Sequence, residues 1–320
     1  MRSMLPLEIV DDICHRLSRP DLVSVQRVNS VFQRVTTHIV YQHIPSLPLP
    51  KSVSCLLTLS TNPTLSSHVR ILEIDWRDTS PTANLYHLLH RVLLLLTALT
   101  DLSLELPQLH QPFWLLSQPP FNLTSFTTSL PCKQPLAAFL TSQSSITSLC
   151  LRAPLQAESS NPFYAYFSHQ NVFSLDATIL PNLSHFRTIY DRPSVIAAVV
   201  QGRPVQMASI PLFASLTTDA LQALRKSATP IKRLSVMSFD PFADELLLTA
   251  IVNEFPDLEA LHVVVLLTEY SNVGHILPLV LPVAHTAFLP QDLLRASGPS
   301  LAGFKSLRVR LLFFLRPNTN

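Results

Sequence analysis

The chain contains 12 histidines and four cysteines, so the first question is whether any of them are spaced to bind a metal ion. His87 and His90 stand three residues apart in a segment predicted to be helical, and they therefore share one face. A structural zinc site needs four Cys or His ligands, and no Glu-x-x-His motif or paired cysteine accompanies these two histidines. A zinc pair is the alternative, but we expect polar positions on a helix whose other face is leucine, and no metal or cofactor.

Motifs for nucleotide binding or hydrolysis are also missing from the sequence. The four glycines, at 202, 274, 298 and 303, are too scattered for a phosphate-binding loop, and there is no H-E-x-x-H or G-x-S-x-G motif. His262 lies between two apolar residues of a predicted strand, and a general base there would need a nucleophile or carboxylate beside it. We therefore expect no catalytic activity, with an α/β enzyme as a rival interpretation.

The composition points to a folded protein without a strong electrostatic preference. Of the 320 residues, 47% are apolar and 14% charged, and the net charge of +2 does not favour nucleic acid. The uncharged stretch 270–291 is long enough to span a bilayer, but three prolines interrupt it, so we expect a buried extended insertion and no membrane segment. The cysteines never form a C-x-x-C pair, which favours reduced thiols in the cytoplasm, the nucleus or both.

The first 44 residues predict three short helices. Pro6 suits the first turn of a helix, and Ile9, Ile13 and Leu17 are spaced to form one apolar stripe. A unit of about 40 residues buries too little surface to be stable alone. We therefore expect part of its apolar surface to belong to a partner.

This segment resembles an F-box over about residues 4–44. The matching positions are Leu5-Pro6-x-Glu8-Ile9, Ile13, Leu17, Pro20-Asp21-Leu22, Val28 and Phe32. Asn29 and Phe32 depart from the family, which often has Cys and Trp there. The resemblance implies docking onto the Skp-type adaptor of a cullin–RING ubiquitin ligase. The implied contact residues are Leu5, Pro6, Glu8, Ile9, Leu22 and Val25, although the same residues could only pack the helices on one another.

The rest of the chain repeats a degenerate L-x-x-L-x-L pattern. Copies begin at Val69, Leu99, Ile146, Ile231, Leu258 and Phe304, with weaker ones at Leu123, Leu183 and Val205. Most intervals between copies are 22–30 residues, and amphipathic helix patterns at 83–99, 217–228 and 242–255 fill some of them. The pattern loosely resembles leucine-rich repeats, in which each strand is followed by a returning helix. We expect an α/β fold, with an N-terminal three-helix F-box before an irregular leucine-rich-repeat-like solenoid; a plain α/β sheet domain is the alternative.

These patterns divide the chain into three parts. Residues 1–44 form the F-box-like helical domain, 45–68 a proline-containing connector with the first helical return, and 69–320 the leucine-rich-repeat-like domain. Side chains between the leucines of each strand should form the surface that binds a target protein. The candidates run from acidic to basic along the chain: Glu73, Asp75, Glu105, Arg152, His262, Arg308 and Arg310.

The expected function is that of a substrate-recognition subunit of an SCF-type ubiquitin ligase. It would hold a target protein near the ubiquitin-loaded enzyme, with the Skp-type adaptor and cullin complex as partners and no chemistry of its own. The alternative is a non-ligase interaction scaffold whose N-terminal helices cap the repeats. Exposure of Leu5, Pro6, Ile9 and Leu22 would separate the two, because a cap buries these residues against the repeats and a docking module leaves them exposed.

Overall fold

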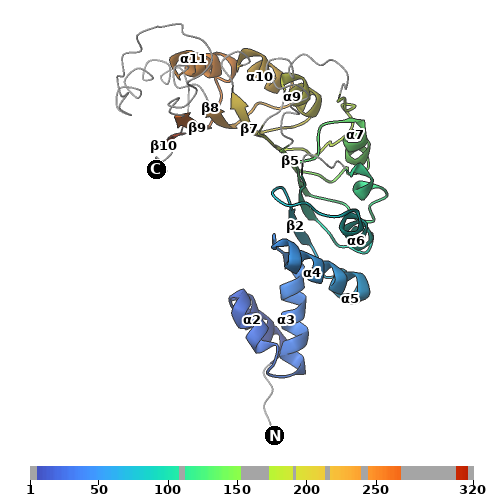
Figure 1. Ribbon diagram of the computed structural model, residues 1–320. Coiled ribbons are helices and arrows are strands. Elements are labelled where there is room, and N and C mark those ends of the chain that lie inside the picture. Colours follow the sequence, from blue (N-terminus) through green and yellow to red (C-terminus); the bar gives the residue numbers. More distant parts are fainter. Residues whose placement is uncertain are drawn as a thin grey trace, which may run out of the picture. The chain divides into compact units, whose positions relative to one another are not determined.

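The protein is built from short parallel strands that alternate with helices (Figure 1). The computed structural model describes residues 6–107, 112–152, 173–189, 192–212, 217–238, 244–267 and 308–315. The chain divides into two compact units, residues 1–153 (the N-terminal unit) and residues 154–320 (the C-terminal unit). The predicted α/β class is confirmed, as an open parallel sheet.

Three helices at the start of the N-terminal unit form a small bundle, here called the helical module. They are α1 (Leu7–His15), α2 (Arg19–Val25) and α3 (Ser30–Gln42). Asn29 caps α3, because its side-chain oxygen accepts hydrogen bonds from the backbone N–H groups of Val31 and Phe32. The module has its own core, made of Val10, Cys14, Leu22 and Val35 with Leu17, Phe32, Ile39 and Val40 packed around it.

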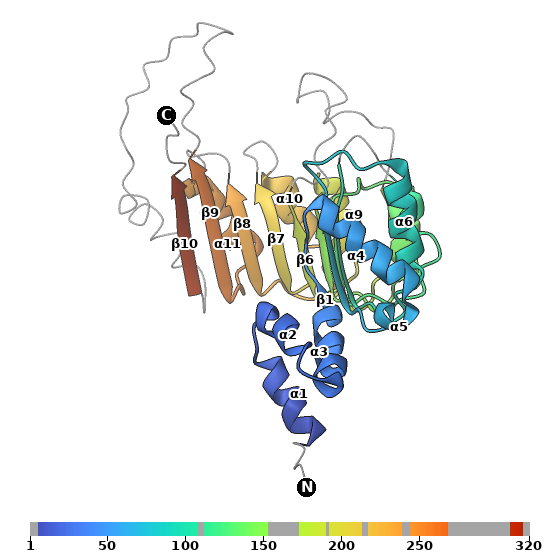
Figure 2. The ribbon, with the colours of Figure 1, turned by 60° about the horizontal axis from the view of Figure 1, so that its bottom comes forward.

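The helical module runs directly into the sheet of the N-terminal unit. Its elements are β1 (His43–Ile44), α4 (Leu49–Thr61), α5 (Pro63–Ser66), β2 (Ile71–Asp75), α6 (Ala83–Leu93), β3 (Asp101–Glu105), η1 (Phe113–Leu116), β4 (Ser125–Thr128), α7 (Gln134–Thr141) and β5 (Ser148–Leu151). The strands pair in sequence order, all parallel. The helices α4, α6 and α7 lie on one face of these strands (Figure 2). Residues 45–68, predicted to be a connector with a helical return, contain α4 and α5, whereas the sequence did not predict a strand at 43–44.

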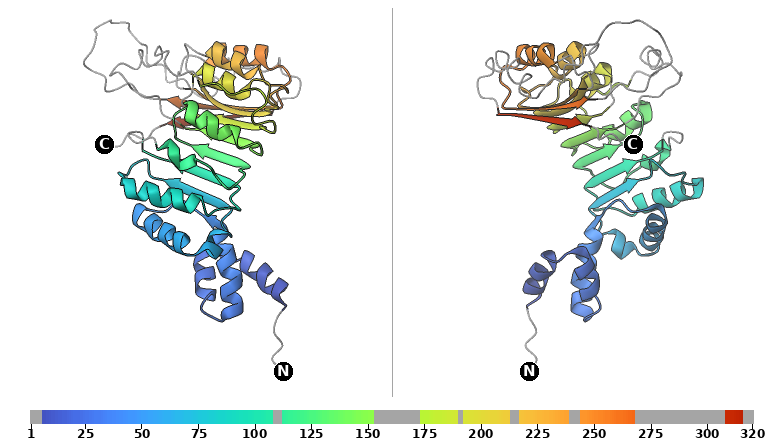
Figure 3. Two further views of the ribbon diagram at one scale, coloured as in Figure 1. Left: turned by 90° about the vertical axis from the view of Figure 1, so that its right-hand side faces the viewer. Right: turned by 60° about the vertical axis from the view of Figure 1, so that its left-hand side comes forward.

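The C-terminal unit repeats the same architecture. Its described elements are β6 (His185–Thr188), α9 (Pro193–Val200), β7 (Met207–Leu212), α10 (Thr217–Leu224), β8 (Arg233–Ser238), α11 (Asp244–Glu254), β9 (Ala260–Leu267) and β10 (Arg308–Leu315). Neighbouring strands again pair in parallel from β6 to β10. The three helices lie together on one face of this sheet (Figure 3).

The L-x-x-L-x-L pattern located the strands correctly. The central positions 72, 102, 126, 149, 186, 208, 234 and 261 all fall inside strands, and their side chains are all buried. The last predicted centre, Leu307, immediately precedes β10. In each unit the buried central residues of neighbouring strands are register partners, as Leu72, Leu102, Phe126 and Leu149 are. Burying this row against the helices supplies the hydrophobic core of each unit.

Consecutive strands are also joined by a repeated backbone contact just before β3, β4, β5, β7, β8 and β9 begin. The N–H groups of Thr100 and Asp101 both donate to the carbonyl of Arg70, and those of Thr124 and Ser125 both donate to the carbonyl of Thr100. The same double contact recurs at 147–148, 206–207, 232–233 and 259–260. Each turn is thereby fixed to the preceding one, whatever the length of chain between them.

Buried and partly buried polar side chains form hydrogen bonds with further backbone groups of these turns. Gln143 accepts a hydrogen bond from the N–H of Leu123 and donates one to the carbonyl of Phe121. Ser227 donates to the carbonyls of Arg203 and Val205. These hydrogen bonds matter because a buried backbone carbonyl without a donor is costly.

Arg203 also donates hydrogen bonds to backbone carbonyls in this region. Its side chain is fully buried, so its guanidinium needs acceptors within the protein. Its guanidinium donates to the carbonyls of Asp176 at 2.6 Å and Val199 at 2.8 Å, and also to those of Ile179, Ala198 and Gln201. Burial lowers the pKa of Arg203 below its usual value. The guanidinium therefore joins the turn before β6 to the end of α9.

The sequence analysis predicted that the chain has no membrane segment. No helix among the residues that the structure describes has both the length and the apolar composition of a bilayer-spanning segment. The uncharged stretch 270–291 lies outside the described residues.

Replacing Arg203 with Met should lower the free energy of unfolding by about 3 kcal/mol, because several buried carbonyls lose their donor. Urea unfolding followed by circular dichroism would measure this loss, and hydrogen exchange should locate it in α9 and β7. The matched control is Arg187→Met on the exposed side of β6, where a change within about 0.5 kcal/mol is expected. Equal effects of the two substitutions would contradict a structural role for the buried guanidinium.

Candidate functional site

The helical module carries apolar side chains on its surface as well as in its core. Ile9 and Ile13 lie one turn apart on α1 and are 48% and 42% exposed, and Val28, in the turn before α3, is 65% exposed. Leu7 and Val23 are similarly exposed. We call these five residues the apolar surface of the helical module. Contiguous exposed apolar patches mark protein–protein contacts, and among these residues Ile9 and Ile13 are neighbours on one face of α1.

The stripe predicted for α1 is therefore turned outward. The residues of α1 that face the core are Val10 and Cys14, each one position beyond Ile9 and Ile13, and only Leu17 of the predicted stripe packs against the core. The sequence offered two adjacent apolar stripes on one short helix. Periodicity alone could not decide which stripe is covered by α2 and α3.

The predicted adaptor contacts fall into three groups. Pro6, Glu8 and Ile9 are exposed, and Val25 is half-buried. Leu22, however, is only 4% exposed and belongs to the core of the module, so it is not accessible to a partner in this conformation. Leu5 lies outside the described residues.

The helical module is attached to the first strand by polar contacts. The guanidinium of Arg19, at the start of α2, donates to the carbonyls of Val40 and His43. Helix α3 also contacts β1 and α5. These contacts involve the end of α3 that leads into the sheet, and they leave Ile9, Ile13 and Val28 exposed.

A second candidate site lies where the strands of the N-terminal unit end, the usual place for ligands in open parallel sheets. The Nε and Nη2 atoms of Arg77 donate to the carboxylate of Asp75 at 3.0 and 2.7 Å. Arg77 Nε also lies 3.8 Å from Glu105 Oε2, and Arg152 Nη1 lies 3.0 Å from Glu105 Oε1. We call these four residues, Asp75, Arg77, Glu105 and Arg152, the charged cluster.

Glu105 stands at the centre of the charged cluster and is only 3% exposed. Neither of its carboxylate oxygens has a hydrogen-bonding partner of suitable geometry among the described residues. Burial raises the pKa of Glu105 above its usual value, and the charges of Arg152 and Arg77 offset only part of that effect. The pKa of Asp75 is lowered, chiefly by its hydrogen bond to Arg77. Two carboxylates thus face two guanidinium groups, and the predicted acidic end of the sheet is neutralised.

The structure brings together three of the predicted target-binding residues, Asp75, Glu105 and Arg152. Glu105 must be corrected as a contact residue, because its side chain is buried. The sequence analysis missed Arg77, which lies in the turn after β2 and not between leucines. A search for basic residues within two positions of Asp75 would have found it.

The other predicted target-binding residues lie elsewhere. Glu73 pairs with His43 at 3.0 Å and is a register partner of Ser103 on the face opposite the buried leucines. In the C-terminal unit the Nδ1 atom of His262 lies 3.2 Å from the hydroxyl of Ser235. Arg308 and Arg310 occupy β10 in register with Ala260 and His262.

The two histidines considered as zinc ligands pack against an indole ring. The centroids of His87 and His90 lie 4.7 and 5.4 Å from that of Trp114, and His90 Nδ1 lies 3.2 Å from the carbonyl oxygen of Leu115. Within the described part of the chain, no group of three or more His, Cys, Asp or Glu side chains is arranged to hold a metal ion. These histidines are therefore packing residues around Trp114.

Replacing Glu105 with Gln should stabilise the protein relative to the native chain as the pH rises from about 4.5 towards neutral. A raised pKa means that the native carboxyl stabilises the fold at low pH and loses this contribution as it ionises, whereas glutamine does not ionise. The gain is about 1.4 kcal/mol for each unit of pKa shift. Urea unfolding followed by tryptophan fluorescence would measure it, since Trp76 and Trp114 both lie in the N-terminal unit.

Asp75→Asn is the control for this experiment. The pKa of Asp75 lies below its usual value, so Asp75 stays ionised between about pH 5 and pH 7.5. The change in unfolding free energy caused by Asp75→Asn should therefore be constant over that range. A growing loss of stability for Glu105→Gln over the same range would mean that the buried charge is stabilising.

No protein-family model matches this chain, and no curated protein is significantly similar to it.

Proposed function

We propose that this protein is a substrate-recognition subunit of an SCF-type cullin–RING ubiquitin ligase. Its helical module would dock a Skp-type adaptor, and its strand–helix units, as an irregular leucine-rich-repeat-like solenoid, would hold a target protein. The protein would carry out no chemistry itself, and ubiquitin transfer would be done by partner subunits in the cytoplasm or nucleus.

The observation that supports this proposal best is the apolar surface of the helical module. A bundle that served only to cap the sheet would bury its apolar groups against the sheet. Here the module already has a core of its own, and Ile9, Ile13 and Val28 remain in solvent. Together with the F-box-like order of residues from Pro6 to Phe32, this surface favours docking onto another protein.

The alternative is an interaction scaffold without a ligase role. It is favoured by the contacts of α3 with β1 and α5, which cover the start of the sheet. In that case the capping helix is α3 alone, and the exposed side chains of α1 have no assigned purpose.

The target would bind to the strand face opposite the helices. In the N-terminal unit this face presents a row of register partners, Glu73, Ser103, Thr127 and Cys150. In the C-terminal unit the corresponding row is Arg187, Ser209, Ser235, His262 and Arg310. Ser103, Thr127, Ser209 and Ser235 are short polar residues within these rows, and they leave room for a partner's side chains to approach the sheet.

The full chain should capture a purified Skp-type adaptor in a 1:1 complex, and the double substitution Ile9→Asp with Ile13→Asp should weaken that capture about 100-fold or more. Two carboxylates placed at the centre of an apolar contact would be desolvated without partners, and a 100-fold loss equals about 2.7 kcal/mol. Size-exclusion chromatography and calorimetric titration would measure the complex and its affinity.

Leu57→Asp on α4 is the matched control, because Leu57 is 51% exposed but lies outside the helical module. It should bind the adaptor as the native chain does. Circular dichroism should show both variants folded, since none of the three residues belongs to the core. No capture by the folded native chain would overturn the ligase proposal and leave the scaffold interpretation.

A further inference from the structure

The strands of the C-terminal unit carry positive charge and no negative charge. From β6 to β10 their sequences contain no Asp, Glu or Lys, and their charged residues, histidines aside, are Arg187, Arg233, Arg308 and Arg310. The strands of the N-terminal unit show the reverse, with four carboxylate residues and no Lys or Arg. The strand face of the C-terminal unit is therefore complementary to a negatively charged partner.

Two of these arginines, Arg187 and Arg233, are exposed on the face of the sheet opposite the helices. Their immediate neighbours within β6 and β8 are buried, and alternate residues of a strand point to opposite faces. Neither guanidinium is hydrogen-bonded or ion-paired to another residue within the described part of the chain. Glu259, just before β9, is already paired with Lys232 at 3.1 Å, so this pair adds no net charge. Both arginines are therefore available to a partner.

The strand register fixes the spacing of the two arginines. Arg187 is the register partner of Ser209 on β7, and Arg233 is the register partner of Met207 on the same strand. They are thus two strands apart across the sheet and two residues apart along it, which places their Cα atoms roughly 12 Å apart. In an extended segment the side chains of residues i and i+4 point to the same side and are about 13 Å apart. Two carboxylates with that spacing match the two guanidinium groups.

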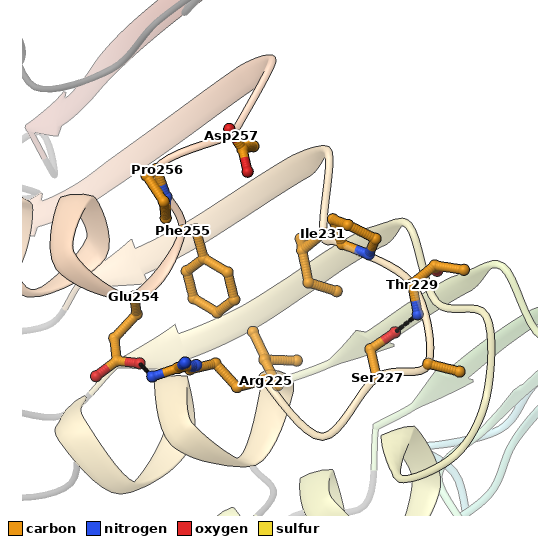
Figure 4. A pocket seen from close by; sticks show the side chains of 11 residues that line it. Arg225, Ser227, Thr229, Ile231, Glu254, Phe255, Pro256 and Asp257 are labelled. Atoms are coloured by element: carbon orange, nitrogen blue, oxygen red, sulfur yellow. Dashed lines mark hydrogen bonds and ion pairs between the residues drawn. The ribbon is translucent and has the colours of Figure 1, made fainter.

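The pocket of this unit is a weaker candidate for binding a partner. It measures about 290 Å³ and lies between the turns that precede β8 and β9 (Figure 4). Its apolar lining residues Ile231 and Phe255 are nearly inaccessible to solvent, and Arg225 on its rim is paired with Glu254 at 3.0 Å. Among its lining residues a partner would find no accessible apolar floor and no unpaired guanidinium, in contrast with the strand face.

We propose that the strand face of the C-terminal unit binds an extended segment of a target protein in which two acidic side chains stand four residues apart. One carboxylate pairs with Arg187 and the other with Arg233, through charge-assisted hydrogen bonds. The residues between them cross β7, where Ser209 leaves room for the segment. The inference rests on the proposed function only in taking the partner to be a ligase target.

A protein segment fits this face better than a nucleic acid does. Affinity for nucleic acid comes mainly from many basic residues that follow a continuous phosphate backbone. Here the short neutral side chain of Ser209 and the apolar side chain of Met207 separate two single arginines. Two isolated carboxylates require no more than these two cations.

The test uses the full chain and three pentapeptide probes, N-acetyl-Glu-Thr-Ser-Thr-Glu-amide, N-acetyl-Gln-Thr-Ser-Thr-Gln-amide and N-acetyl-Glu-Glu-Thr-Ser-Thr-amide. Saturation-transfer NMR detects weak binding of such probes, and titration at low ionic strength gives the dissociation constants. We expect the first probe to bind at least about 10-fold more tightly than the glutamine probe, which corresponds to about 1.4 kcal/mol. The third probe should bind more weakly than the first, because adjacent carboxylates point to opposite sides and cannot reach both arginines.

The double substitution Arg187→Gln with Arg233→Gln should reduce the affinity for the first probe to that of the glutamine probe. Arg91→Gln with Lys226→Gln is the matched control, since it removes the same charge from exposed positions on α6 and in the turn after α10. It should leave the affinity unchanged. Circular dichroism should show both double variants folded, because all four side chains are exposed.

Several results would overturn the inference. They are absence of binding to the folded native chain, equal affinity for the first probe and either of the others, and binding that survives loss of Arg187 and Arg233. A thymidine trinucleotide carries the same two negative charges as the first probe, so equal or tighter binding of it would indicate a phosphate site instead. Adaptor capture by the Arg187, Arg233 double variant should be unchanged, so failure of this inference and failure of the proposed function can be told apart.

Discussion

The double backbone contact that precedes β3, β4, β5, β7, β8 and β9 is the constraint on which the rest of the structure depends. Two consecutive N–H groups meet one carbonyl of the preceding turn, from Arg70 to Thr124 in the N-terminal unit and from Ser184 to Lys232 in the C-terminal unit. This contact sets the register of neighbouring strands, so the leucines of successive strands fall in one buried row. It also places the intervening polar residues in a row on the opposite face. Insertions between strands are tolerated because the contact involves only the turn itself.

The sequence predicted the elements that follow from apolar periodicity. It missed the elements that form only through tertiary contacts with other parts of the chain. The strands and the helices α6, α10 and α11 follow from alternation and amphipathic spacing. Helix α9 could not be predicted in this way, because every residue of its sequence PSVIAAVV after Ser194 is apolar and the segment is rich in β-branched residues. Strand β1 was missed because two residues carry no periodicity, and it exists only through pairing with β2.

The candidate sites show the same division. The exposure of Ile9 was inferred from a family-like pattern, but the burial of Leu22 required knowing how three helices fit together. Glu105 alternates correctly with its buried neighbours, and its burial depends on Arg77 and Arg152, which come from distant segments. Asn29 is a further example. It departs from the family pattern, yet it caps α3 through two hydrogen bonds, so the departure supports the same local structure.

The polar residues of the turns link the fold to the proposed recognition surfaces. Ser227 donates to two carbonyls of the preceding turn. These hydrogen bonds fix the segment that leads to Ile231 against that turn. Leu258 N–H donates to the carbonyl of Phe255 in the next turn. The strand face that follows these turns is consequently preformed, because the turns are fixed by the contacts that hold the sheet together. A preformed strand face spares a partner the entropic cost of ordering it.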